Sequence, residues 1–160
     1  MTFCENRQRR VLIVDDIEDN RVLLERTLRS GGYVTVGVEN GAKALACLSS
    51  ETFDIVLLDW MMPGLSGLET LNIIRQTHHR NELPVIMCTA VGEEANIVDA
   101  MEAGANDYVL KPISLPVLRA RMTAHLAQSE EISNLSREKH ESAQRLADQM
   151  RRLWEARAAG

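Results

Sequence analysis

The run Asp54-Ile-Val-Leu-Leu-Asp59 constrains the fold more than any other feature, because four consecutive apolar residues lead directly to a carboxylate. Two further apolar runs also end on charged side chains, one on Asp15 with Asp16 and the other on Lys111. Continuous apolar runs of this length are typical of strands that are covered on both faces, and therefore of a parallel sheet. Ligands of open parallel sheets bind where the carboxyl ends of the strands meet. The sequence therefore predicts that these four charged residues form one site.

Amphipathic segments alternate with apolar runs along the chain. Strands are expected at 11–14, 34–38, 55–58, 84–88 and 108–110, with helices at 17–30, from Asn40 through Leu48, at 68–77, at 93–103 and from Ser114 onward. In one parallel sheet, this alternation requires right-handed crossovers and helices on both faces. The flavodoxin-like strand order 2-1-3-4-5 is the common solution. We therefore expect a doubly wound α/β fold with the first and third strands side by side.

This strand order predicts a metal site. It would bring Asp15, Asp16 and Asp59 within a few ångströms of one another, and carboxylates that close repel unless a cation joins them. A hard divalent ion is indicated. Mg²⁺ fits, because it accepts a few carboxylate oxygens and keeps waters and a phosphoryl oxygen as its other ligands. The alternative for Asp15 or Asp16 taken alone is a helix cap.

Composition narrows the classes of function. The chain has 160 residues, 45% of them apolar, which suffices for one globular domain and a tail. A net charge of −5 argues against direct nucleic-acid binding, which relies on Lys and Arg. Residues 1–10 lack the apolar core of a signal peptide, and no stretch approaches the roughly 20 apolar residues of a membrane span, so we expect a cytoplasmic protein without a membrane partner. Cys4, Cys47 and Cys88 suit reduced thiols, two of them in the core.

The set Asp15-Asp16, Asp59, Thr89 and Lys111-Pro112, in this order along the chain, resembles the receiver domain of two-component response regulators. The resemblance spans about residues 10–127 and includes the loop Met62-Pro63-Gly64 with Gly67 and the segment from Gly104 to Pro112. It implies that Asp59 accepts a phosphoryl group from a sensor histidine kinase, a phosphotransfer protein or a small acyl phosphate. The chain would then be a signalling domain and not a turnover enzyme.

The resemblance also implies roles for the surrounding residues. Mg²⁺ would be held by Asp16 and Asp59, by Asp15 through water, and by the backbone carbonyl of Met61. Lys111 would pair with the phosphoryl oxygens, and a cis Lys111-Pro112 bond would aim it into the site. The Thr89 hydroxyl would contact the phosphoryl group.

Thr89 and Tyr108 resemble the switch pair of the family. When Thr89 moves toward the phosphoryl group, the Tyr108 ring can turn into the vacated space and change the face made by the fourth helix, fifth strand and fifth helix. Simple packing of Tyr108 against the sheet is the alternative.

From Ser114 to about Arg157 the pattern stays helical, with its only proline in the first turn. A seam with 3-4 spacing from Leu118 to Arg157 favours a parallel dimeric coiled coil with a polar middle. A separately solvated helix is the alternative. We therefore divide the chain into an N-terminal tail (1–9), a receiver domain (10–127) and a helical extension (128–160).

The helical extension resembles the linkers between receivers and catalytic output domains, cyclic-dinucleotide synthases among them. No DNA-binding helix-turn-helix or cyclase motif is found in the sequence. The extension would lead to an output domain, or the chain would act by dimerising or by binding an effector protein.

Two other functions compete with the receiver. The first is a phosphorylation-independent coiled-coil adaptor. It would not need the set Asp16, Asp59, Thr89 and Lys111, whose members are costly to group without a ligand. A phosphatase of the haloacid dehalogenase type needs a second Asp two residues after the nucleophile, and that position is Met61.

Overall fold

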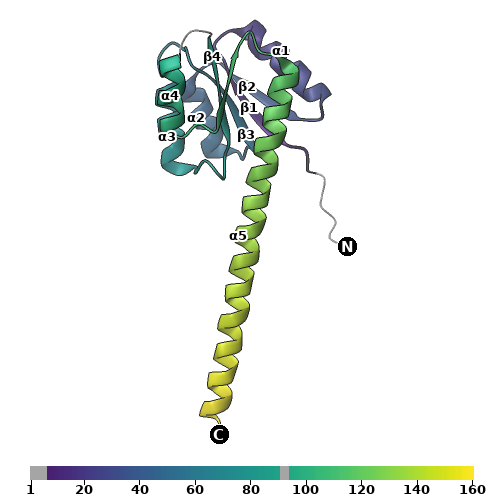
Figure 1. Cartoon of the computed structure of the whole chain (residues 1–160), viewed down its shortest axis with the longest axis vertical. Helices are drawn as coiled ribbons and strands as arrows, with labels where there is room; N and C mark the ends of the chain where they lie inside the picture. The colour runs from purple at the N-terminus through teal and green to yellow at the C-terminus, as the bar shows by residue number, and fades with distance from the viewer. Residues whose placement is uncertain (1–6, 91–93) are drawn as a thin grey trace.

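The computed structural model describes residues 7–90 and 94–160. Five parallel strands form one sheet in the order β2-β1-β3-β4-β5, which confirms the flavodoxin-like arrangement (Figure 1). The strands are β1 (Arg10–Val14), β2 (Val34–Val38), β3 (Ile55–Asp59), β4 (Val85–Ala90) and β5 (Asp107–Lys111). The helices are α1 (Glu18–Ser30), α2 (Gly41–Ser50), α3 (Gly67–Thr77), α4 (Glu94–Glu102) and α5 (Leu115–Ala158). The expected first residue of the fourth helix, Glu93, and most of the expected N-terminal tail lie outside the described residues.

Helices cover both faces of the sheet, and the apolar runs of the sequence follow from this. Within β1, Val11 and Ile13 contact the cluster under α1 and α5, whereas Leu12 and Val14 contact the cluster under α2, α3 and α4. Side chains alternate between the faces of a strand, so a strand that is buried on both faces needs apolar residues at every position.

The expected helix ends are mostly confirmed. The Asn40 side chain accepts a hydrogen bond from the Lys43 N–H at 2.8 Å and caps α2. Gly104 follows α4 with a φ of +102°, a left-handed conformation that favours glycine. Ser114 lies at the N-cap position of α5, but its side chain makes no capping hydrogen bond.

Of the cysteines, Cys88 is buried and Cys47 is only half-buried, so the expectation of two core thiols was right for one of them. Cys4 lies outside the described residues. No helix among the described residues is long and apolar enough to cross a membrane.

The helix α5 is a single element of 44 residues, roughly 66 Å long, of which only the beginning packs on the sheet (Figure 1). Leu118 and Met122 are fully buried in the domain core, and Leu126 is its last buried residue. The expected coiled-coil seam was therefore wrong in its first part, because its positions from Leu118 to Ser129 contact the chain's own domain. The pattern available to a partner helix begins near Ile132.

Candidate functional site

Three carboxylates meet at the carboxyl ends of β1 and β3. Single carboxylate oxygens of Asp15, Asp16 and Asp59 lie within 4.8 Å of one another. The strand pairing explains this, because Val14 is aligned with Leu58 and each strand delivers the following residue to the same edge. Asp15 and Asp59 are buried, with 3% and 4% of their surface exposed, and Asp16 is open to solvent. The predicted convergence of these side chains is confirmed.

Lys111 supplies the cation of this cluster. Its Nζ donates a hydrogen bond to Asp59 Oδ1 at 2.9 Å and lies 3.6 Å from Asp15 Oδ2. β5 ends at Lys111, and the Lys111-Pro112 peptide bond is cis, as expected. The ammonium group therefore reaches the carboxylates from a strand two positions away in the sheet.

The cluster of Asp15, Asp16, Asp59 and Lys111 contains more negative than positive charge. Burial raises the pKa of Asp59 and the charges of Asp15 and Asp16 raise it further, although Lys111 opposes both. Burial alone would lower the pKa of Lys111, but its hydrogen bond to Asp59 and the charges of Asp59 and Asp15 outweigh burial and raise it. Three carboxylates against the Lys111 ammonium group leave an excess of negative charge. Hard oxygen donors with excess negative charge fit a divalent ion such as Mg²⁺.

Thr89 and Tyr108 lie beside the cluster on β4 and β5. Asp59 is aligned with Cys88, so the buried Thr89 is the next residue on the strand beside Asp59. Tyr108 is aligned with Met87, and alternate residues of a strand share a face, so Thr89 and Tyr108 lie on the same side of the sheet. Tyr108 is half-buried and packs against the core under α2, α3 and α4. The two side chains therefore share the face of the sheet that α2, α3 and α4 cover.

The loop after Asp59 is held close to the strand. Met61 follows the buried Trp60, and 66% of the Met61 surface is exposed. The Gly67 N–H donates to the Trp60 carbonyl at 2.9 Å, and a Cβ at Gly67 would lie 2.3 Å from the Asp59 carbonyl oxygen. Only glycine permits this approach, so the start of α3 fixes the backbone that carries Asp59.

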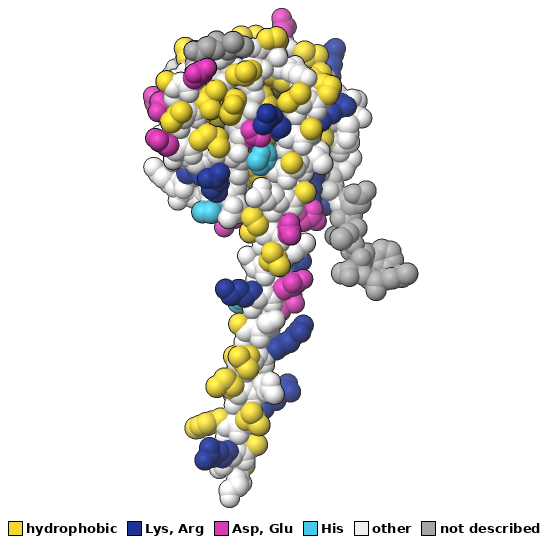
Figure 2. Space-filling model, in the orientation of Figure 1, with side chains coloured by type: hydrophobic (Ala, Val, Ile, Leu, Met, Phe, Trp, Pro, Cys, Tyr) yellow, Lys and Arg dark blue, Asp and Glu magenta, His cyan; other side chains and the backbone are white. Residues whose placement is uncertain are grey.

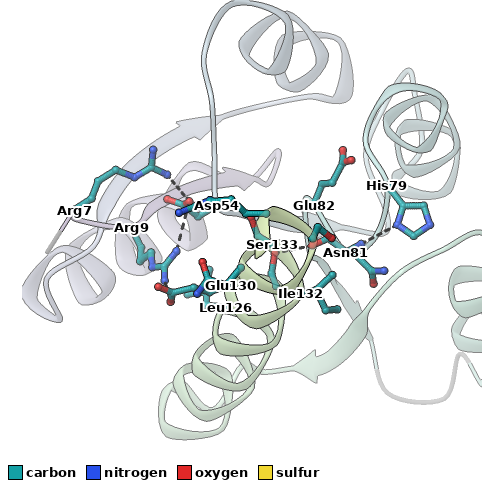
Figure 3. A pocket seen from close by; sticks show the side chains of 14 residues that line it. Arg7, Arg9, Asp54, His79, Asn81, Glu82, Leu126, Glu130, Ile132 and Ser133 are labelled. Carbon is teal, nitrogen blue, oxygen red and sulfur yellow. Dashed lines mark hydrogen bonds and ion pairs between the residues drawn. The ribbon is translucent and has the colours of Figure 1, made fainter. Parts of the chain in front are cut away.

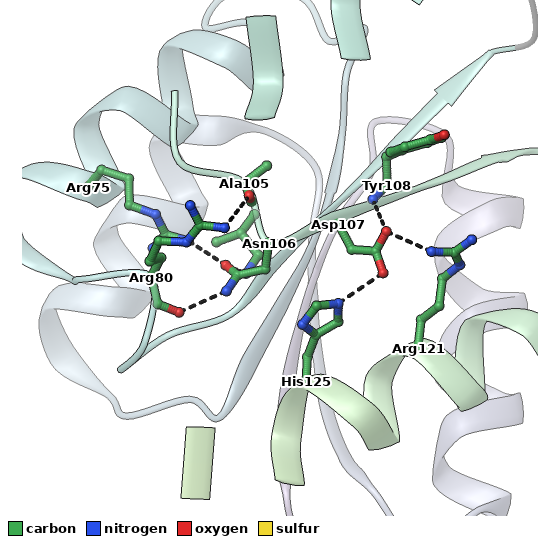
Figure 4. Close-up of polar contacts among 9 residues, drawn as sticks. Arg75, Arg80, Ala105, Asn106, Asp107, Tyr108, Arg121 and His125 are labelled. Atoms are coloured by element: carbon green, nitrogen blue, oxygen red, sulfur yellow. Dashed lines mark hydrogen bonds and ion pairs between the residues drawn. The ribbon is translucent and has the colours of Figure 1, made fainter. Parts of the chain in front are cut away.

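A polar cluster on β5 and α5 was not foreseen from the sequence. Asp107 accepts hydrogen bonds from Arg121 at 2.8 Å and from the backbone N–H of Tyr108 at 2.8 Å, and it lies 2.9 Å from His125 Nε2 (Figure 4). Burial alone would raise the pKa of Asp107, but these partners outweigh it and lower the pKa. The four-residue spacing of Arg121 and His125, which puts both on one helix face, was the available signal.

A second unforeseen network joins α3 to the start of β5. The Arg75 guanidinium donates to Asn106 Oδ1 at 2.9 Å (Figure 4). It also donates to the Gly104 carbonyl at 2.8 Å and to the Leu83 carbonyl at 3.0 Å. Burial lowers the pKa of Arg75 to about 10, with a contribution from the charge of Arg80. Arg75 thus fixes the turn that leads from α4 into β5 and toward Lys111.

Cys88 lies beside Asp59 but is chemically inert. It is buried, and burial raises the pKa of its thiol to about 12. A thiol with that pKa holds almost no thiolate at neutral pH, so it is a poor nucleophile.

Comparison with known proteins gives a consistent family. The model of the response regulator receiver domain matches residues 11–123. The chemotaxis protein CheY of Pseudomonas aeruginosa is 37% identical over 114 residues, which are 71% of this chain and 92% of CheY. The phosphate regulon transcriptional regulatory protein PhoB of Rhizobium meliloti is 40% identical over 130 residues, 80% of this chain and 57% of PhoB. The chain thus spans about half the length of the PhoB relatives that it matches.

Solved structures agree with the sequence relatives. A CheY-like receiver domain protein from Methanospirillum hungatei superposes with a TM-score of 0.73 at 27% identity, over 78% of this chain and 98% of that one. An adenylate cyclase structure from Rhodopirellula baltica gives a TM-score of 0.74 at 25% identity, over 81% and 96%. With the sheet order and the acidic cluster, these matches establish that the chain belongs to the response regulator receiver family.

Proposed function

We propose that the chain is a phosphorylation-activated receiver that accepts a phosphoryl group on Asp59 from a sensor histidine kinase or a phosphotransfer protein. One observation carries the proposal: the buried Asp59 carboxylate lies 2.9 Å from Lys111 Nζ, beside two further carboxylates. Such a cluster is costly to bury unless a cation and a charged ligand use it. Receiver domains act as signalling domains, and we assign no turnover of a separate substrate to this one.

In the proposed reaction, an Asp59 carboxylate oxygen attacks the phosphorus of a phosphohistidine. The new O–P bond forms as the N–P bond breaks, and the nitrogen leaves with the bonding electron pair. Asp16 and Asp59 would hold Mg²⁺, with Asp15 acting through water and Met61 through its backbone carbonyl. When bound, the ion would neutralise part of the negative charge on the phosphoryl group. Lys111 would exchange part of its contact with Asp59 for the phosphoryl oxygens.

The signal would pass to the face formed by α4, β5 and α5. Thr89 would move toward the phosphoryl group and Tyr108 would turn inward. Val98, Leu110 and Val117 are 57%, 43% and 47% exposed on the elements of this face. Hydrophobic side chains gather on the surface around α4 and α5 in Figure 2. A change in this apolar patch would alter binding of an effector or an output domain.

The helical extension, assigned to residues 128–160, would form a parallel dimeric coiled coil in the cytoplasm. Leu146, Met150 and Leu153 are 58%, 63% and 65% exposed at 3-4 spacing, and hydrophobic side chains gather along this stretch in Figure 2. The extension would link two receivers to an output domain or to an effector protein. Leu146→Ala combined with Leu153→Ala should abolish dimerisation, whereas Arg152→Ala on the charged side should not.

The test is gel mobility in a phosphate-binding gel, with and without acetyl phosphate and Mg²⁺. A Mg²⁺-dependent shift is expected for the wild type and for Asp19→Asn, an exposed control, and no shift for Asp59→Asn. Light scattering of the same samples would report whether the mass changes with phosphorylation. No shift with a small donor or with a kinase would contradict phosphoacceptance and favour the phosphorylation-independent adaptor.

A further inference from the structure

A polar groove lies between α5 and the domain (Figure 3). It is at the amino ends of the strands, whereas Asp59 is at the carboxyl end of β3. Its lining residues come from the segment before β1, the residue before β3, the loop before β4 and the part of α5 beyond the core. The groove has a volume of about 1100 Å³, and among the described residues its lining includes only two apolar side chains, Leu126 and Ile132. Beyond Leu126, the contact between α5 and the domain therefore changes from apolar to polar.

In the part of the chain that the structure describes, two side-chain contacts cross this groove. Glu130 of α5 forms an ion pair with Arg9, whose guanidinium also lies 3.8 Å from Asp54. Ser129 Oγ donates a hydrogen bond to the Asn81 carbonyl at 2.7 Å. We call this pair of contacts, Arg9 with Glu130 and Ser129 with Asn81, the latch. Both domain partners of α5 are on irregular segments and not on a strand or a helix.

The latch is weaker than the packing that precedes it. The Arg9 and Glu130 side chains are 34% and 50% exposed, and exposed ion pairs contribute little to stability and are screened by salt. Leu126, by contrast, is 6% exposed in the core. The latch can therefore open while the domain stays folded and α5 stays attached through its buried residues.

A small opening of the latch would have a large effect at the far end of the helix. From Ser129 to Ala158 the helix extends roughly 44 Å, so a tilt of about 10° would move its end by roughly 8 Å. The groove leaves room for such a tilt, because the described residues that line it are mostly polar and enclose a volume of about 1100 Å³.

We infer that the latch is a releasable device that sets the direction of α5 beyond Leu126 relative to the receiver domain. Closed, it holds the helical extension in one orientation. Open, it allows a range of orientations with the domain unchanged. The inference does not depend on phosphorylation of Asp59. The latch would set the orientation of the helical extension from the amino ends of the strands, opposite to the Asp59 site.

Pulsed electron paramagnetic resonance on spin labels at Asn72 of α3 and Gln144 of α5 tests this inference. The native cysteines would be replaced by serine or alanine, and labelled protein would be diluted with unlabelled protein to suppress signals between copies. With the latch intact, one narrow distance distribution is expected. Glu130→Gln with Ser129→Ala should broaden or shift the distribution by several ångströms, in line with a tilt of about 10°.

Glu131→Gln is the matched control, because it removes a neighbouring charge without touching either contact, and its distribution should stay narrow. Arg9→Lys keeps a positive charge beside Glu130 and Asp54 and should keep the distribution narrow, whereas Arg9→Gln should broaden it. High salt should broaden the wild-type distribution. Circular dichroism of each variant would verify that the fold is retained. Equally narrow distributions in all variants at low and high salt would overturn the inference.

Discussion

The beginning of α5 and its distal segment (residues 133–158) belong to one helix but are stabilised by different forces. Leu118, Met122 and Leu126 bury their side chains against the sheet, and full burial of such a side chain contributes about 1.5–3 kcal/mol. Every residue of the distal segment is exposed. Its visible interactions are ion pairs within the helix, such as Asp148 with Arg151 at 3.2 Å, worth about 0.3–0.5 kcal/mol each.

The difference shows what each part can do. The beginning of α5 is part of the receiver core, so it cannot change partner without unfolding the domain. The distal segment has an apolar stripe and buries no side chain in the domain, so its partner is free to change with the state of the protein. A helix without tertiary packing is marginal in water, and a second helix would stabilise it.

The largest effect is expected from removing a buried side chain of α5. Leu118→Ala should lower the free energy of unfolding by about 2–5 kcal/mol, because it leaves a cavity in the core. Leu146→Ala, at a residue that is 58% exposed, should change it by less than about 0.5 kcal/mol. Urea denaturation measures both, with the fluorescence of Trp60 as the signal in a Trp154→Phe background. Equal losses in the two variants would show that the distal segment folds together with the domain.

A smaller effect is expected from the polar cluster that joins β5 to α5. Asp107→Asn should cost about 1–2 kcal/mol at neutral pH, because it weakens the hydrogen bonds with Arg121 and His125. The pKa of Asp107 lies below its ordinary value of 3.8, so the folded state favours the charged form. This stabilisation is therefore present above pH 3.8 and is lost as the pH falls through the lowered pKa.

Urea denaturation of the wild type and Asp107→Asn between pH 7 and pH 3 would test this pH dependence. The difference between the two proteins should shrink only at the acidic end. Asp148→Asn in the distal segment is the control, with a small and nearly constant effect. A difference that shrinks already near neutral pH would contradict the role of the Asp107 carboxylate.

The sequence predicted the fold and the meeting of the charged residues well, for a physical reason. A strand buried on both faces needs an unbroken apolar run, so Asp59 and Lys111 were recognisable at the ends of such runs. The strand order then brought Asp59 beside Asp15, and the structure confirms the approach. Element ends were less accurate: β4 runs from Val85 to Ala90, beyond the expected end at Cys88, because backbone pairing with β5 continues to Lys111.

The sequence could not predict which surface or side chain a given residue contacts in the folded protein. The spacing of Leu118 and Met122 fits a helix that packs on its own sheet as well as one that packs on another helix. Their assignment to a coiled coil was wrong because periodicity does not identify the surface that covers a face. The contact of Asp107 with His125 likewise depends on the tertiary position of α5 against β5.

The smallest effect is expected within the distal segment itself. Glu141→Gln removes the partner of Arg145, whose guanidinium lies 4.0 Å from it one turn along the helix. The expected loss is a few tenths of a kcal/mol, because an exposed pair at this spacing is weak and solvated. Circular dichroism at 222 nm during heating measures helix content, and the change should disappear in high salt, which screens the pair. A loss as large as that of Asp107→Asn would mean that Glu141 contacts a partner helix, and the distal segment would then be no longer solvated on its charged side.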